Sequence, residues 1–146
     1  MELADLKRDV FQPVAKRLRE RADSLQQVAR LFREERNNIG IEGWLKVEVA
    51  AALGEKVARL HSGRCGGPDV SLVTGDKIEL KAATDLNLVY IREGCTKYGV
   101  PCMFLGDGRD AARKLAIPPS GTVLIAYEIF TDGSNDWVIG MIAPEQ

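Results

Sequence analysis

The sequence is poor in several residue types, and each shortage narrows the choice of protein class. Aromatic residues make up 6% of the chain, there is one histidine, and the three cysteines lie at irregular spacing. Such cysteines fit reduced core thiols better than a disulfide framework. No apolar run approaches the length of a membrane-spanning helix, and the first residues lack the apolar segment of a signal peptide. The sequence therefore predicts a cytoplasmic globular protein.

The shortage of sulfur and imidazole ligands also disfavours zinc. The only histidine, His61, is followed by Cys65, and Cys95 and Cys102 come far downstream. Structural zinc sites usually use tightly spaced ligand pairs, and neither spacing here matches them. A single histidine at the end of a strand is more often structural or exposed, so zinc remains the weaker alternative.

The chain has no charge excess of the kind that marks many nucleic-acid-binding domains. Its formal net charge is −1 over 146 residues, a length that fits one domain with a real core. Residues 1–36 hold nine Lys and Arg against seven Asp and Glu, whereas residues 37–146 hold eleven against fourteen. The acidic second part weakens a nucleic-acid interpretation, although carboxylates that bind a cation would account for some of it.

What the sequence does contain is an alternating stretch from Pro68 to Lys81 that predicts a β-hairpin. Apolar and polar residues alternate on both sides of a tight turn at residues 74–77, where Gly75 can take a positive φ. Successive strand side chains point to opposite faces, so Glu79 and Lys81 share one face. Pairing of the two strands would bring Asp69 to the face of Glu79. The stretch thus predicts two carboxylates and an ammonium in one small volume.

This combination suits metal-assisted hydrolysis of a phosphodiester. Mg²⁺ prefers hard oxygen ligands and is usually held by one or two carboxylates together with water and substrate phosphate. A nearby lysine can orient the attacking water or contact the phosphate. The alternative without a function is a solvent-exposed strand face, because edge strands often alternate Glu and Lys for solubility.

The pattern Pro68-Asp69, nine residues, then Glu79-x-Lys81 resembles the motif of the PD-(D/E)XK nuclease family. The resemblance covers roughly residues 42–105. The glycine- and serine-containing segment before Asp69 is also loosely similar to that of the archaeal-type Holliday junction resolvases within the family. It implies a restriction-endonuclease-like fold and a Mg²⁺- or Mn²⁺-dependent nuclease. By this resemblance Asp69, Glu79 and the backbone carbonyl of Leu80 hold the metal, and Lys81 serves the nucleophilic water.

The family also uses a glutamate on the preceding helix, which we expect over residues 41–53. Glu48 lies within the apolar stripe of that helix and is the better match for the third acid of the metal site. Glu42 stands at the helix start, where it could simply complement the helix dipole, and is kept as a reserve candidate. The glycine-rich loop at residues 62–67 is open to two interpretations. Arg64 could meet a phosphate there, or the loop is a flexible connection.

Two helices are predicted before this core, with a break near Phe11-Gln12 because Pro13 cannot continue an intrahelical hydrogen bond. The second has an apolar stripe and a basic face of six residues. That face could meet phosphates or pair two copies of the chain as a homodimer. The favoured alternative is a charged, solvated face on a helix that packs against its own domain. The basic residues are Lys16, Arg17, Arg19, Arg21, Arg30 and Arg33.

The remaining pattern completes an α/β domain. Strands are expected at residues 56–61 and 102–105, a helix from Thr84 or Asp85 to Tyr98 with Val89 inward, a short helix at 111–116, and a hairpin over 122–142. We therefore predict a central mixed sheet flanked by helices with an αβββαβ core. The single domain 1–146 divides into a helical extension (1–37), a nuclease-like core (40–106) and a C-terminal helix and hairpin (107–146).

The sequence supports one main functional hypothesis and two alternatives. The main hypothesis is a Mg²⁺- or Mn²⁺-dependent phosphodiesterase acting on nucleic acid, with DNA favoured, in which Lys81, Glu79, Asp69 and Glu48 are catalytic. The first alternative is a non-catalytic regulatory or binding module that keeps the fold, favoured by the acidic balance and by the lack of a DNA-reading motif. The second is a small dimeric interaction protein built on the N-terminal helices.

Overall fold

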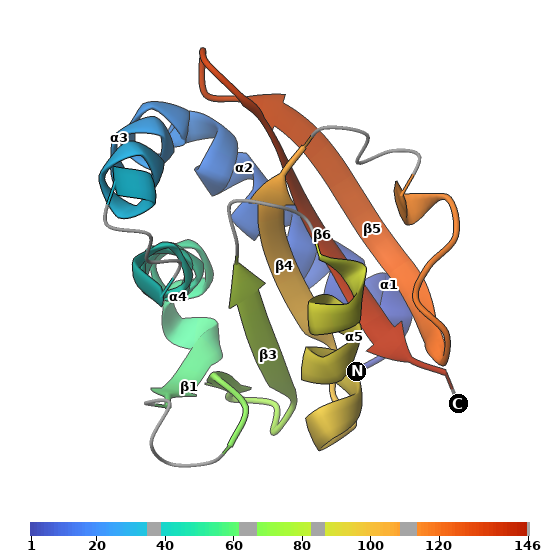
Figure 1. The fold of residues 1–146 in the computed structure, drawn as a ribbon. Coiled ribbons are helices and arrows are strands. Elements are labelled where there is room, and N and C mark those ends of the chain that lie inside the picture. Colours follow the sequence, from blue (N-terminus) through green and yellow to red (C-terminus); the bar gives the residue numbers. More distant parts are fainter. Residues whose placement is uncertain (35–38, 62–66, 83–86, 109–113, 146) are drawn as a thin grey trace.

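The fold is a six-stranded sheet between helices (Figure 1). The computed structural model describes residues 1–34, 39–61, 67–82, 87–108 and 114–145. Its elements are α1 (Leu3–Leu6), the π-helical η1 (Lys7–Phe11), α2 (Gln12–Glu20), α3 (Ala22–Glu34), α4 (Ile39–Leu53), the 3₁₀-helical η2 (Gly54–Lys56), β1 (Val57–Leu60), β2 (Val70–Leu72), β3 (Lys77–Ala82), α5 (Leu88–Tyr98), β4 (Cys102–Asp107), β5 (Thr122–Thr131) and β6 (Asp136–Pro144).

The strand order is β1-β2-β3-β4-β6-β5, and the sheet is mixed. Strands β3 and β4 run parallel and are joined through α5, whereas the other neighbouring strands pair antiparallel. A parallel pair needs a crossover, and a helix is the usual one. The predicted α/β class is confirmed, and the order α4-β1-β2-β3-α5-β4 follows the expected αβββαβ pattern.

Helices cover both faces of the sheet. In Figure 1, α1 and α2 lie behind the sheet and α5 lies in front of it, with α4 beside β3. The larger core joins the rear helices and α4 to the residues of β3 that alternate as Ile78, Leu80 and Ala82. A smaller core joins α5 to β4 through Cys102 and Phe104. The intervening residues of β3 therefore belong to the α5 face.

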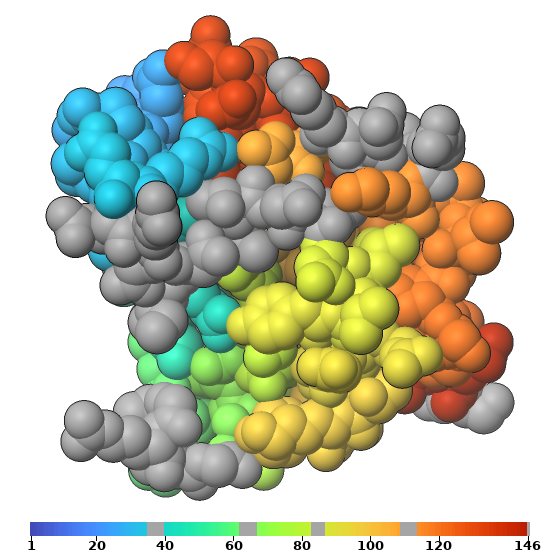
Figure 2. Space-filling model, viewed as in Figure 1, coloured from blue at the N-terminus to red at the C-terminus, as the bar shows by residue number. Residues whose placement is uncertain are grey.

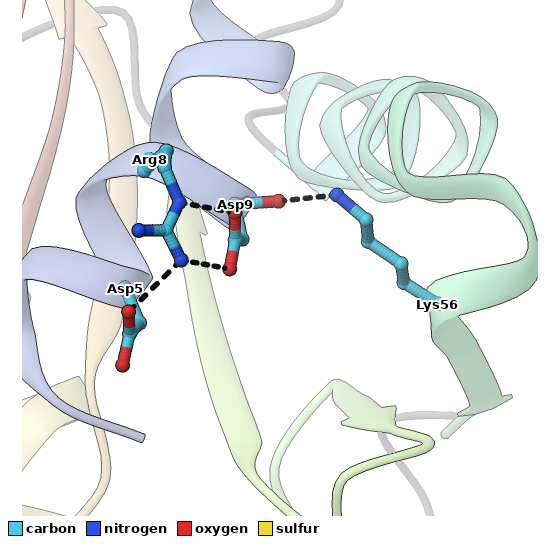
Figure 3. A network of polar contacts seen from close by, with 4 residues as sticks. All are labelled: Asp5, Arg8, Asp9 and Lys56. Atoms are coloured by element: carbon cyan, nitrogen blue, oxygen red, sulfur yellow. Dashed lines mark hydrogen bonds and ion pairs between the residues drawn. The ribbon is translucent and has the colours of Figure 1, made fainter.

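The N-terminal helix passes Pro13 without the predicted break, so that prediction is wrong. Residues 7–11 form a π-helical turn, and Phe11 and Gln12 both keep helical dihedral angles. Proline has no N–H for the carbonyl four residues earlier, which is that of Asp9. Lys56 Nζ donates to this carbonyl oxygen at 3.1 Å, while Arg8 holds the Asp9 carboxylate (Figure 3). The orphaned acceptor is thus satisfied, and the chain first turns at Arg21.

The basic residues of the N-terminal helices largely bind to the chain's own carboxylates. Arg19 forms an ion pair with Glu128 on β5, and Arg33 lies 3.1 Å from Asp107 at the end of β4. Arg33 also stacks on the indole of Trp137 at 5.6 Å. These contacts favour the interpretation of a helix packed on its own domain over a free phosphate-binding face.

Helix α5 begins later than predicted. Asn87 is its N-cap, and its side chain accepts the backbone N–H of Tyr90 at 3.1 Å. The predicted caps Thr84 and Asp85 lie outside the described residues, as do the first half of the predicted helix at 111–116 and residues 62–66 of the glycine-rich loop, Arg64 among them. Val89 is 60% exposed, so its predicted inward position is wrong. None of the helices in the described ranges is long and apolar enough to cross a membrane.

Candidate active site

The β2–β3 hairpin sets the geometry of the predicted site. Gly75 takes φ +92° in the turn, and Val70 pairs with Ile78 while Ser71 pairs with Lys77. Continuing this register by one residue places Asp69 opposite Glu79, as the sequence predicts. Glu79 pairs with Cys102 and Lys81 with Phe104, so both polar side chains of β3 lie on the face that α5 covers.

Asp69 is held by two donors, and its residue is only 8% exposed. One carboxylate oxygen accepts the backbone N–H of Leu80 at 2.9 Å. The other oxygen lies 2.9 Å from Lys46 Nζ, which also donates to the carbonyl of His61 at 2.9 Å. The neighbouring Glu79 carboxyl also lowers the pKa of Asp69. Lys46 therefore ties α4 and the end of β1 to the aspartate.

The pKa values of the two carboxylates are shifted in opposite directions, which favours one proton on the pair at neutral pH. Burial and the adjacent Asp69 raise the pKa of Glu79 to about 8, so Glu79 is the protonated partner at neutral pH. Burial works against ionisation of Asp69 as well, but hydrogen bonds from Glu79, Lys46 and the Leu80 amide outweigh it and lower the Asp69 pKa. Two carboxylates that share one buried site do not both ionise readily without a compensating cation. The pair is thus a place where a cation can replace a proton.

Lys81 is enclosed by helix α5. Its ammonium lies 4.4 Å from the centroid of the Tyr90 ring, a cation–π distance. One turn later, Gly94 leaves room for the aliphatic stem, because a Cβ there would lie 2.9 Å from Lys81 Cε and 3.0 Å from its Cγ. Burial would lower the pKa of Lys81, but Tyr90, Glu42 and Glu79 together raise it. The lysine is therefore held as a cation beside the carboxylate pair.

The upstream glutamate that reaches this site is Glu42, the reserve candidate. Its carboxylate accepts the Tyr90 hydroxyl at 3.1 Å, and it interacts electrostatically with both Lys81 and Asp69. Burial raises the pKa of Glu42, and Lys81 and Tyr90 only partly oppose that rise. Glu42 and Lys46 are four residues apart, so one stripe of α4 faces the site.

Glu48 lies on a different side of α4. It is buried at 3% exposure, and its carboxylate contacts Arg17 Nε at 2.5 Å and Arg21 Nε at 3.4 Å. These arginines come from the N-terminal helices, which pack against α4. The structure thus brings Asp69, Glu79, Lys81 and Glu42 together and places Glu48 in an interhelical ion pair.

The donor set suits a hard divalent cation such as Mg²⁺. The described residues contain no group of three or more His, Cys, Asp and Glu side chains gathered as metal ligands. Mg²⁺ does not need such a cage, because one or two carboxylates with water and phosphate suffice. The Leu80 N–H points toward Asp69. In an extended strand the carbonyl of a residue lies on the same edge as its N–H, so the Leu80 oxygen shares this edge.

Two further residues of the site were not expected from the sequence. Lys46 reads as an ordinary polar position on an apolar helix, and Tyr90 reads as a core residue of α5. Nothing local distinguishes them, because their roles depend on how α4 and α5 flank β3. The spacing of Glu42 and Lys46 by four residues was the one available signal.

Comparison with known proteins gives no match: no family model, no curated protein and no solved structure is significantly similar to this chain. The interpretation of the site therefore depends on its geometry and chemistry.

Proposed function

We propose that this chain is a metal-dependent nuclease that hydrolyses phosphodiester bonds of nucleic acid, with DNA as the favoured substrate. The observation that carries the proposal is the buried pair of Asp69 and Glu79, whose proximity and burial raise the pKa of Glu79 to about 8, with Lys81 on the same face of β3 as Glu79. A solvated edge strand does not explain it, because both carboxylates are buried. Perturbed titratable groups gathered in this way are typical of functional sites.

The residues that would hold the ion are Asp69, Glu79 and the carbonyl of Leu80. Bound Mg²⁺ or Mn²⁺ supplies an acidified water and offsets the negative charge of the phosphate. Lys46 keeps Asp69 ionised and therefore ready to accept a cation. Lys81, held by Tyr90, orients the attacking water or contacts the scissile phosphate. Glu42 fixes Tyr90 through its hydroxyl and is the third acid of this proposal.

A cleavage assay tests the proposal directly. Single-stranded, duplex and four-way-junction DNA are incubated with the protein in Mg²⁺, Mn²⁺ or chelator, with Lys81→Ala and Asp69→Asn proteins purified in parallel. We expect metal-dependent cutting that both substitutions reduce by at least about 100-fold, the usual scale for loss of a catalytic group. Equal cutting by wild type and variants would point to a contaminating nuclease and contradict the assignment.

Glu42 and Glu48 provide a matched pair of control variants. Glu42→Gln should lower cleavage while leaving the unfolding temperature nearly unchanged. Glu48→Gln should lower the unfolding temperature, because Arg17 and Arg21 lose their carboxylate partner, and should leave cleavage per folded molecule intact. The reverse result would restore Glu48 as the third acid.

Absence of cutting on every substrate and with every ion would favour the non-catalytic module. Isothermal titration of the wild-type protein with Mn²⁺ then separates the two functions, because a binding module has no need to hold a divalent ion at Asp69 and Glu79.

A further inference from the structure

The face of the sheet that carries Asp69 and Glu79 continues onto β1 and β2 as rows of polar side chains. The register pairs Arg59 with Ser71 and Ser71 with Lys77, so these three residues form one row across the strands. The next row holds His61, Asp69 and Glu79, because the backbone N–H of His61 donates to the backbone carbonyl of Asp69 at 2.9 Å. Two residues along a strand cover about 6.6 Å, so the rows lie about that far apart.

The first row is joined to the second by a hydrogen bond. His61 Nε2 lies 2.9 Å from Ser71 Oγ, and both side chains are half-buried. This contact holds the imidazole of the second row against the Ser71 hydroxyl, and Ser71 lies between Arg59 and Lys77 in the first row. The first row and His61 together supply a guanidinium, a hydroxyl, an ammonium and an imidazole, which are groups that can bind phosphate oxygens.

Arg59 and Lys77 differ from many basic residues of this protein. Both side chains are exposed, and within the described part of the chain neither forms an ion pair. By contrast, Arg17, Arg19, Arg21 and Arg33 each meet a carboxylate. In Figure 2, green atoms of the β1–β3 region are visible beside α5, which is drawn in yellow.

We propose that Arg59, Ser71, His61 and Lys77 form a subsite for the backbone phosphate next to the scissile one. This inference rests on the proposed nuclease function and assigns the direction in which the nucleic-acid strand crosses the sheet. The spacing of the two rows, about 6.6 Å, is close to the distance between neighbouring phosphates of a nucleic-acid strand. The strand would therefore run along β2 and β3, with one phosphate at the carboxylate pair and its neighbour at the row of Arg59.

The competing explanation is that Arg59 merely protects an edge strand, because β1 lies at the edge of the sheet. Charged residues on edge strands do prevent unwanted pairing. That explanation covers Arg59 but not the Ser71–His61 contact. Ser71 lies on the interior strand β2.

The experiment measures binding separately from cleavage. Fluorescence anisotropy follows a labelled single-stranded oligonucleotide and a duplex in EDTA, where metal-dependent cutting cannot occur. The test variant is Arg59→Gln/Lys77→Gln. The charge-matched control is Lys7→Gln/Lys16→Gln, which removes two exposed cations from the N-terminal helices. Circular dichroism and thermal unfolding confirm that each variant is folded.

We expect the test variant to bind single strands about tenfold or more weakly. The slope of log K against log salt should fall by about 0.7, for the one phosphate that the subsite would hold. The control variant should keep the wild-type affinity and slope. Ser71→Ala should weaken binding several-fold without changing the slope, because it removes no charge. In cleavage assays KM should rise in the test variant while kcat stays near wild type.

Equal binding by the test and control variants, or no measurable binding by the wild type, would overturn the subsite. The proposed function is judged by a different result. Binding that depends on Arg59 and Lys77 without any cutting in Mg²⁺ or Mn²⁺ would refute the nuclease and leave the subsite in place. Metal-dependent cutting with an unchanged KM in the test variant would support the nuclease and refute the subsite.

Discussion

The proton shared by Asp69 and Glu79 should make the stability of this protein depend on pH in a defined direction. The pKa of Glu79 rises from 4.5 to about 8 on folding. The stability that this group contributes is therefore fully present below about pH 4.5 and is lost as the pH rises through about 8. Above pH 4.5 the unfolded chain releases this proton while the folded chain keeps it. In chelator, the protein should become less stable between pH 5 and pH 8.

The size of the effect follows from the shift. One pKa unit corresponds to about 1.4 kcal/mol, so an isolated glutamate with this shift would lose about 3 kcal/mol of stability from pH 5 to pH 8. The lowered pKa of Asp69 affects stability only at more acidic pH, because the stability that this group contributes is lost as the pH falls below the usual pKa of an aspartate. For a domain of this size, 3 kcal/mol corresponds to a change in Tm of about 10 °C.

The assay is thermal and urea unfolding at pH 5 to 9 in EDTA, for wild type and Glu79→Gln. The glutamine stays neutral and can still donate to Asp69, so its stability should change much less with pH and should exceed that of wild type at pH 8. Glu34→Gln, at a side chain that is 63% exposed, is the surface control and should follow the wild-type curve. Addition of Mn²⁺ at pH 8 should raise the stability of the wild-type protein more than that of Glu79→Gln. Parallel pH profiles for wild type and Glu79→Gln would refute the shared proton.

Three further predictions concern the surroundings of the site and the distant hairpin. Gly94→Ala should destabilise the protein by about 1 kcal/mol in urea unfolding, because the new Cβ meets Lys81 and, at 3.3 Å, the buried Cys102 sulfur. Gly43→Ala on α4 meets nothing within 4 Å and should stabilise by about 1 kcal/mol, so a stabilised Gly94→Ala would contradict the close packing of Lys81. Lys46→Met should raise the pKa of Asp69 and shift acid unfolding to higher pH, whereas an unchanged acid midpoint would show that Lys46 does not control this carboxylate. Asp132→Ala should cost about 2–3 kcal/mol, because Asp132 accepts the indole N–H of Trp137 at 2.8 Å and two backbone N–H groups at 2.7 Å, and a neutral result would show that water replaces these bonds.

The parts of this fold that were predictable are those encoded by local patterns. The alternation around Gly75 predicted the hairpin and the approach of Asp69 to Glu79, because strand periodicity alone decides which side chains share a face. The element order followed from glycine, proline and apolar spacing. The break at Pro13 was wrong because its consequence depends on Lys56, a residue far away in sequence that supplies the missing donor.

The choice between Glu42 and Glu48 could not be made from the sequence. Both lie on one helix, and the apolar stripe around Glu48 indicates burial without saying what covers it. In the structure that cover is the N-terminal helix pair, whose Arg17 and Arg21 neutralise Glu48. The positions of Glu42 and Tyr90 depend on α4 and α5 meeting across β3, a tertiary arrangement with no local sequence signal.

The placement of β6 between β4 and β5 has a consequence for the order of assembly during synthesis. Residues 136–144 are the shared partner of two strands that precede them in the chain, and most of β6 is buried. A nascent chain that has emerged only as far as β5 can form the β2–β3 hairpin locally, but β4 still lacks one of its neighbours. Domains of this kind complete non-local pairing late. The core that α5 and β4 share also contains Val138 and Ile142 of β6, so the cover of the carboxylate pair would be complete only after β6 has left the ribosome, and a chain interrupted before Asp136 should carry the hairpin without this cover.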